Sequence, residues 1–245
     1  MNPVILSRLA DAEASAHGHD CVIDVRSPAE FDDDHLPGAI NLPVLDNAEH
    51  ALVGTIYKQQ SAFAARKVGA ALVARNAARH IEGALAHHDK SWRPLVYCWR
   101  GGQRSGAFAT ILSNIGWRVG VVEGGYKTWR RLVTQVLDTP VVHRLLLLDG
   151  NTGTAKTAVL GRLASCGAQV VDLESLAHHR GSLFGHHALA QPSQRSFESS
   201  VARALSSADT SRVLFLEAES ARIGVLHLPG RLRSAMLAGI SSPER

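Results

Sequence analysis

The 245-residue sequence is poor in cysteine and aromatic residues and has no long apolar run. Its three cysteines, Cys21, Cys98 and Cys166, lie far apart and form no CxxC pair. This spacing argues against a zinc site or a disulfide framework and favours a reducing compartment. No apolar stretch approaches the ~20 residues that a membrane-spanning helix needs, and the N-terminal residues lack a signal-peptide pattern. We therefore expect a cytoplasmic localisation and no membrane partner.

A strong charge excess of one sign is also missing. The chain has 26 Lys and Arg against 22 Asp and Glu, a net charge of +4. This mild excess fits an ordinary solvated surface as well as a nucleic-acid contact. The segment 54–85 has helical spacing of its apolar residues and carries Arg66, Lys67, Arg75 and Arg79 off that stripe. Arg75 and Arg79 lie one helical turn apart, so they are candidates for binding phosphates.

Short apolar runs alternate with helical patterns, which predicts parallel sheets. In the first half, strands are expected at 21–25, 39–42, 95–98 and 119–122, with helices after Pro28 and at 54–85, 105–114 and 127–137. The pattern restarts after Asp138-Thr139-Pro140 with strands at 145–148, 169–173 and 213–216, and with a helix that ends near residue 165. We therefore predict an α/β protein with domains at residues 1–138 and 139–245.

Cys98 is the strongest candidate for a reactive group, because it ends an apolar run and opens a glycine- and arginine-containing loop. The loop comprises Trp99, Arg100, Gly101, Gly102, Gln103 and Arg104. Its glycines allow N–H groups to point inward, and its arginines and the following helix N-terminus favour a thiolate. A buried structural cysteine is the alternative. The spacing from Cys98 to Arg104 also occurs in tyrosine phosphatases, but Tyr97 stands where those proteins carry His.

A second loop has the composition of a phosphate-binding loop. It comprises Gly150, Asn151, Thr152, Gly153, Thr154, Ala155, Lys156 and Thr157. It matches GxxxxGK[ST] except at Ala155 and lies between an apolar strand and a helix, so its N–H groups and Lys156 are expected to hold phosphate. Thr157 is expected to bind Mg²⁺ if the ligand is a nucleotide. An ordinary strand–turn–helix with a chance match is the alternative.

Two glutamates follow the last of these strands. Glu217 ends the strand and Glu219 is two residues further on, on the same face if the strand continues. They are candidate acidic partners of the phosphate loop. A solvated strand end is the alternative.

Several segments resemble known families. Residues 24–43 (DVRSPAEFDDDHLPGAINLP) and 123–129 (EGGYKTW) resemble the opening and closing signatures of rhodanese-like sulfurtransferases. Nearly the whole chain is similar to the tRNA 2-selenouridine synthase family. Besides those two signatures, the similarity rests on YCWRGGQRSGA, the inserted segment 54–76 that begins with GTIYKQQ, LESLAHHRGSLFG, QPSQRSFE and EAESARIGVLHLP. The resemblance implies a rhodanese-like domain followed by a P-loop NTPase-like domain, with the second domain incomplete because family members continue beyond the last residue. It also implies that Asp24 and Arg26 orient the sheet ends.

The resemblance further implies a transferase that converts wobble 2-thiouridine in tRNA to 2-selenouridine through an S-geranyl intermediate. Its substrates would be geranyl diphosphate and selenophosphate. No tightly bound cofactor is implied, and Mg²⁺ is a candidate metal ion. Cys98 would carry sulfur or selenium as a persulfide or selenopersulfide, and Gly150–Thr157 would hold the diphosphate. The implied partners are tRNA and a selenophosphate supplier, and the oligomeric state stays open. Two alternatives remain: a plain sulfurtransferase with a vestigial second domain, and a nucleotide-dependent kinase or regulator with a rhodanese-like binding module.

Overall fold

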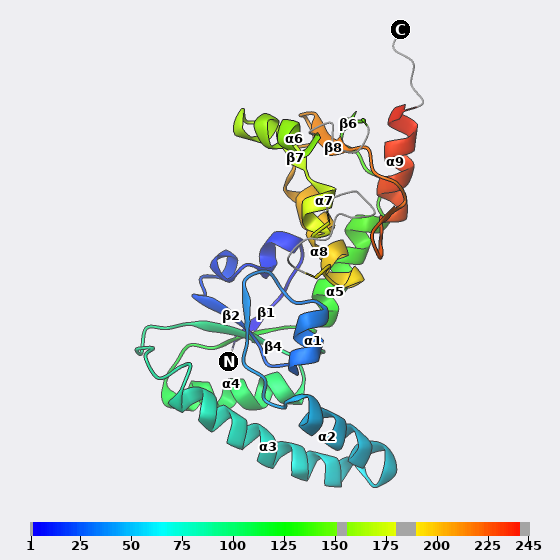
Figure 1. Ribbon diagram of the computed structural model, residues 1–245. Helices are drawn as coiled ribbons and strands as arrows, with labels where there is room; N and C mark the ends of the chain where they lie inside the picture. The colour runs from blue at the N-terminus through cyan, green and yellow to red at the C-terminus, as the bar shows by residue number, and fades with distance from the viewer. Residues whose placement is uncertain (1, 151–155, 180–189, 241–245) are drawn as a thin grey trace. The chain divides into compact units, whose positions relative to one another are not determined.

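The computed structural model describes residues 2–150, 156–179 and 190–240 (Figure 1). The chain divides into two compact units, Met1–Leu132 and Val133–Arg245. The division falls inside helix α5 (Tyr126–Asp138), six residues before the boundary predicted at residue 138. Among the described residues, none of the helices has both the length and the apolar composition to span a bilayer.

The first unit is built on a five-stranded parallel sheet in the order β1-β5-β4-β2-β3. The strands are β1 (Asn2–Val4), β2 (Cys21–Asp24), β3 (Ala39–Asn41), β4 (Pro94–Tyr97) and β5 (Gly120–Val122). The helices of this unit are α1 (Pro28–Asp33), α2 (Asn47–Gln59), α3 (Ala62–Glu82), α4 (Gln103–Ile115) and the start of α5. All four residues of β4 are buried, as expected for a central parallel strand that is covered on both faces. Two short 3-10 turns, Leu9–Ala12 and Ala14–His17, precede β2.

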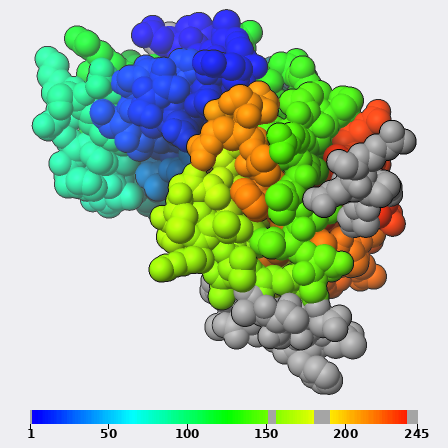
Figure 2. All heavy atoms as spheres, turned by 90° about the horizontal axis from the view of Figure 1, so that it is seen from above, coloured from blue at the N-terminus to red at the C-terminus, as the bar shows by residue number. Residues whose placement is uncertain are grey.

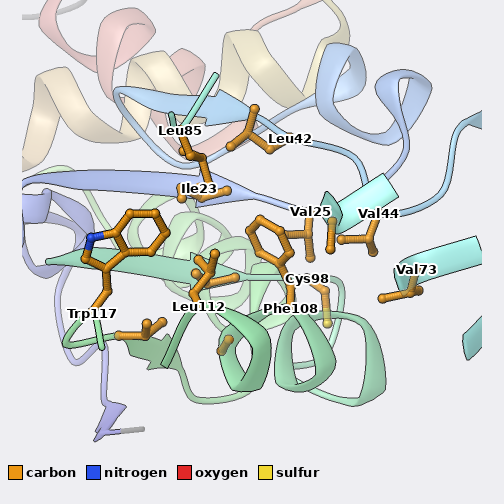
Figure 3. Packing of buried hydrophobic residues seen from close by; sticks show 14 of the residues in the cluster. Ile23, Val25, Leu42, Val44, Val73, Leu85, Cys98, Phe108, Leu112 and Trp117 are labelled. Carbon is orange, nitrogen blue, oxygen red and sulfur yellow. The ribbon is translucent and has the colours of Figure 1, made fainter. Parts of the chain in front are cut away.

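The core of this unit lies between the sheet and α4. Ile23 of β2 packs with Phe108 and Leu112 of α4 (Figure 3). Val96 of β4 belongs to the same cluster, and all four side chains are fully buried. Cys98 belongs to the same cluster. The end of β4 and the start of α4 are therefore fixed by packing, and the loop between them inherits that rigidity.

The long helical segment predicted at 54–85 consists of two helices. Asp46 caps α2 by accepting a 2.7 Å hydrogen bond from the Glu49 N–H, and Ser61 caps α3 by accepting one of 3.0 Å from the Ala64 N–H. The second cap starts a new helix where the sequence pattern predicted continuity. Figure 1 shows α2 folded back on α3 and α3 beside α4, in agreement with their contacts.

The second unit has a three-stranded parallel sheet in the order β6-β8-β7. Its strands are β6 (Leu145–Leu148), β7 (Gln169–Val171) and β8 (Leu214–Glu217), and its helices after α5 are α6 (Lys156–Ser165), α7 (Leu173–Leu176), α8 (Gln194–Ser207) and α9 (Gly230–Ile240). In α6, which the structure describes throughout, only Leu160 is buried. The rest of this part of the chain is largely at the surface, where Figure 2 shows the yellow-green segment 156–179. The predicted α/β class with parallel sheets is confirmed in both units.

An antiparallel hairpin was not expected from the sequence. It is formed by β9 (Arg222–Ile223) and β10 (Leu226–His227), with Gly224 at a positive φ of 59° in the turn. The Gln191 amide fastens the hairpin by accepting a 2.9 Å hydrogen bond from the Val225 N–H and donating one of 3.1 Å to the Ile223 carbonyl. Strands of two residues are too short to give a periodic signal, which explains why the pattern did not reveal them.

Candidate functional site

The loop from Cys98 to Arg104 is closed by the turn that precedes α5. The Tyr126 N–H donates a 2.9 Å hydrogen bond to the Cys98 carbonyl, and the Lys127 N–H donates one of 3.1 Å to the Trp99 carbonyl. Gly125 has a φ of 59°, and a Cβ there would overlap the Cys98 carbonyl oxygen. Only glycine permits this close approach, so the EGGY segment acts as the second wall of the thiol loop.

Cys98 is buried, with 3% of its surface exposed, but its surroundings stabilise the thiolate. The Ser105 hydroxyl lies 3.1 Å from Sγ and donates a hydrogen bond to it. Burial by itself raises the thiol pKa, whereas hydrogen bonds from the Ser105 side chain and from the Ser105 and Arg100 N–H groups, with the Arg104 charge, lower it. The balance is a lowered pKa, which favours a nucleophile over an inert core thiol.

Arg104, which was predicted to add positive potential near Cys98, is also paired with a carboxylate. Its guanidinium is paired with Glu30 through Nη1–Oε2 and Nη2–Oε1 contacts of 2.6 and 3.1 Å. Burial raises the pKa of Glu30, but the Arg104 hydrogen bond and charge outweigh it and lower that pKa to about 2. The Arg104 charge still lowers the thiol pKa, in the direction expected from the sequence, but the hydrogen bonds donated to Cys98 lower it more.

A buried ion pair between Asp24 and Arg26 contacts the segments next to the Cys98 loop. The Arg26 Nη2 lies 2.6 Å from Asp24 Oδ2 and donates a second hydrogen bond of 2.6 Å to the Asp34 carbonyl. Its guanidinium lies 4.1 Å from the centroid of the Tyr126 ring, and the Tyr126 hydroxyl donates a 3.0 Å hydrogen bond to Asp34. Asp24 and Arg26 therefore join the end of β2 to the start of α5, an orienting geometry like the one the resemblance implies.

In the second unit, both ends of the predicted phosphate loop are described. Gly150 follows β6, and Lys156 and Thr157 begin α6, which is the strand–loop–helix context that the motif requires. The Lys156 ammonium donates a 2.5 Å hydrogen bond to the Gly150 carbonyl. Five loop residues lie outside the described ranges, so their roles stay predictions: Asn151, Thr152, Gly153, Thr154 and Ala155.

Glu217 and Glu219 form an acidic cluster with Glu174. One carboxylate oxygen from each lies within 4.8 Å of the others. Glu217 Oε2 accepts a 3.3 Å hydrogen bond from the Glu174 N–H, while Oε1 is buried and has no hydrogen-bond partner among the described residues. Glu217 is fully buried, so the alternative of a solvated strand end is wrong for this residue.

Burial and crowding change the acidity of this cluster. Burial, followed by the charges of Asp172 and Glu174, raises the pKa of Glu217 to about 7. Burial and Glu174 raise the pKa of Glu219 to about 7, and Lys156 opposes that rise. Three close carboxylates, one with an unpartnered buried oxygen, fit a hard divalent cation such as Mg²⁺. Sequence reasoning missed Glu174; its only signal was its position just after the end of β7.

The four basic residues predicted at 54–85 as candidates for phosphate contact lie on a helix of the first unit. Arg66, Lys67, Arg75 and Arg79 are all exposed on α3. Arg79 donates a 3.3 Å hydrogen bond to the side chain of Asn76, and its guanidinium stays accessible. The geometry permits a phosphate contact by Arg75 and Arg79, which stays a prediction.

Comparisons with known proteins agree with the two-unit architecture. The model of the rhodanese-like domain matches residues 6–132, and that of the tRNA 2-selenouridine synthase AAA domain matches residues 143–241. The chain is 37% identical over 231 residues to a tRNA 2-selenouridine synthase of Nitrosomonas europaea, covering 91% of this chain and 60% of that protein. It is 35% identical over 216 residues to one of Psychromonas ingrahamii, covering 88% and 58%. The chain thus spans about 60% of the length of these curated relatives. A solved rhodanese with anions from E. coli is 27% identical, with 44% of this chain and 88% of that chain covered and a TM-score of 0.25.

Proposed function

Since the chain belongs to the rhodanese-like family and carries the AAA domain of tRNA 2-selenouridine synthases, we propose that it converts wobble 2-thiouridine in tRNA to 2-selenouridine. One observation carries the proposal: the same chain holds a hydrogen-bonded thiol at Cys98 and a cluster of three glutamates, one of which senses the charge of Lys156 from the phosphate-loop motif. A thiol suits chalcogen transfer, and a phosphate site suits a diphosphate donor.

The first step is geranylation of the nucleoside. The sulfur of 2-thiouridine attacks C1 of geranyl diphosphate, so that a C–S bond forms, the C–O bond breaks, and the N3 proton leaves with the diphosphate. In this proposal Lys156 stabilises the charge that grows on the leaving group. Alkylation makes the sulfur a better leaving group for the second step.

In the second step Cys98 carries selenium. Selenium in selenophosphate is at the selenide level, so loading requires a two-electron acceptor, for which we name a low-molecular-weight disulfide. Thiolate, selenophosphate, disulfide and water give the Cys98 selenopersulfide, phosphate and two thiols. The terminal selenium then attacks C2 of the nucleoside and geranylthiolate leaves with a proton. The two thiols cleave the S–Se bond, which leaves selenium on C2 and restores both the free Cys98 thiol and the disulfide.

The acidic cluster suits a divalent cation in the first step. Glu217 and Glu219, with Glu174, are the residues that would hold Mg²⁺, and Thr157 begins the neighbouring helix. When bound, the ion would neutralise diphosphate charge. Because the pKa values of Glu217 and Glu219 are raised to about 7, a bound cation would favour the deprotonated form of both carboxyl groups near neutral pH.

The test is mass spectrometry of wobble nucleosides from tRNA incubated with this chain, geranyl diphosphate, selenophosphate and a low-molecular-weight thiol together with its disulfide. We expect S-geranyl-2-thiouridine and then 2-selenouridine, and Cys98→Ser should stop the second product, because serine has no accessible anion at neutral pH. Cys166→Ser, at an exposed cysteine of the second unit, is the matched control. If the chain transfers sulfur from thiosulfate to cyanide but forms neither modified nucleoside, it is a plain sulfurtransferase. The Cys98 loop taken alone also fits that activity. Nucleotide hydrolysis without either nucleoside would indicate the kinase or regulator alternative.

A further inference from the structure

An apolar groove lies beside the thiol loop of the first unit. It has a volume of about 680 Å³ and lies between the α2–α3 pair and the start of α4. Val53 and Tyr57 of α2 line it, and Gln103, Arg104 and Ala107 line it from the first turns of α4. The groove therefore touches the helix whose N-terminus closes the Cys98 loop.

Small residues on one helix make room for the groove. Ala62, Ala65 and Gly69 line it from α3 at spacings of three and four, which places them on one helix face, and Ala70 lies next to Gly69. A ligand on this wall would contact methyl groups and backbone atoms, and it would find few side-chain hydrogen-bonding groups there. Such a slot fits a flexible apolar chain.

The floor of the groove adjoins the buried surroundings of Cys98. Leu45 and Val73 line the groove and also belong to the buried cluster that contains Cys98. In the view of Figure 3, Val44 and Val73 lie on the side of Cys98 away from Trp117. An apolar chain in the groove would therefore contact two residues of the cluster that buries the thiol.

The rim carries one exposed cation. Arg66 lines the groove and is exposed, whereas the charge of Arg104 is already offset by Glu30. An apolar slot with an exposed guanidinium beside it complements an apolar chain attached to a phosphate-bearing carrier.

We propose that this groove binds the geranyl group of an S-geranylated tRNA nucleotide while selenium is delivered from Cys98. The inference rests on the proposed function and adds to it a site for the leaving group. Binding of that chain in the groove would bring C2 of the nucleoside to the thiol loop. The selenium on Cys98 and C2 would then react from a fixed orientation, which lowers the entropic cost of the step. Geranylthiol then departs along the groove when the C–S bond breaks and the C–Se bond forms.

The test compares two phenylalanine variants of the full chain. Ala70 lines the groove and is exposed, so Ala70→Phe should fill the groove without disturbing the core. Ala71, the next residue, is also exposed but does not line the groove, so Ala71→Phe is the matched control. Each variant is given tRNA that carries S-geranyl- or S-methyl-2-thiouridine, and kcat/KM for selenium incorporation is measured. Ala70→Phe should lose at least about 10-fold on the geranyl substrate and little on the methyl one, since apolar pockets discriminate by about this factor or more per methylene.

A second measurement separates this inference from the proposed function. A diazirine-tagged geranylthiol is photocrosslinked to the wild type and to both variants, and the labelled peptides are identified. Labelling of α2, α3 and α4 that Ala70→Phe removes supports the groove even if no variant processes tRNA, in which case only the proposed function fails. Labelling elsewhere, or an unchanged preference for the geranyl substrate in Ala70→Phe, overturns the inference. Protection of the groove by geranyl diphosphate but not by S-geranyl-2-thiouridine assigns it to the donor and also overturns it.

Discussion

The Ser105 hydroxyl donates a hydrogen bond to the Cys98 sulfur over 3.1 Å, from a position seven residues further along the chain. Both side chains are buried, so water does not replace this bond when it is removed. The short loop and the first turn of α4 thus bring a donor to the thiolate. The pKa of the Cys98 thiol is lowered by that donor as well as by the Ser105 and Arg100 N–H groups.

Ser105→Ala should make Cys98 less reactive. Loss of a donor to the charged sulfur raises the thiol pKa and reduces the thiolate fraction near neutral pH. Hydrogen bonds to charged groups contribute about 1.5–3 kcal/mol, so alkylation of Cys98 by iodoacetamide should slow on the order of 10-fold at neutral pH. The pH–rate profile should move to higher pH in the variant. Thr110→Ala, which removes an exposed hydroxyl from the same helix, should leave the profile in place. A profile that does not move in Ser105→Ala would show that the loop N–H groups alone hold the thiolate.

Glu217→Gln should stabilise the second unit at high pH and abolish its response to Mg²⁺. The pKa of Glu217 rises from 4.5 to about 7 on folding, so the protonated form is favoured by the folded state. Below pH 4.5 the carboxyl is neutral in both states and the penalty is absent. Between pH 4.5 and about 7 the penalty grows, and above that it is constant, on the order of 3 kcal/mol.

Thermal unfolding near pH 5 and pH 8, with EDTA or with Mg²⁺, measures this effect. In EDTA the variant should exceed the wild type mainly near pH 8, and Mg²⁺ should raise the Tm of the wild type only. Glu82→Gln, at an exposed glutamate of the first unit, is the control. Equal stabilisation of wild type and Glu217→Gln by Mg²⁺ would place the cation elsewhere.

Reversal of Arg75 and Arg79 to Glu should weaken tRNA binding. Both guanidinium groups are exposed on α3, and neutralising phosphates releases counterions. The slope of log affinity against log salt should therefore fall by ~0.7 to 0.9 for each phosphate that is no longer neutralised. Reversal of Arg231 and Arg233, two exposed arginines on α9, serves as the comparison. If both double variants reduce the slope equally, α3 is no more than one part of a general basic surface.

The sequence predicted most strands and the positions of the Cys98 and Gly150 loops. It did not predict which residues from distant parts of the chain contact those loops. Strand β6 was predicted residue for residue, because a run of four leucines has a direct local signal. The Arg104–Glu30 pair joins residues 74 positions apart, and Glu174 reaches Glu217 across 43 positions. Such partners come together only when the sheet order is known. The groove is equally non-local, because its small residues on α3 read as ordinary helix composition until α2 and α4 are placed beside them.

Lys156→Ala should separate the two proposed steps. Lys156 begins α6 at the end of the phosphate-loop motif, and its ammonium is near enough to Glu219 to lower the pKa of that carboxyl. Without it, charge on the departing diphosphate loses a preorganised partner, so geranylation should slow on the order of 10²-fold. Cys98 lies in the other compact unit, so the variant should still load selenium and process tRNA that is already geranylated. Single-turnover assays of each half-reaction measure this, with Arg162→Ala, on the same helix but outside the motif, as the control. If geranylation survives in Lys156→Ala while processing of geranylated tRNA is lost, the phosphate loop serves the selenium donor and the assignment of the two sites must be exchanged.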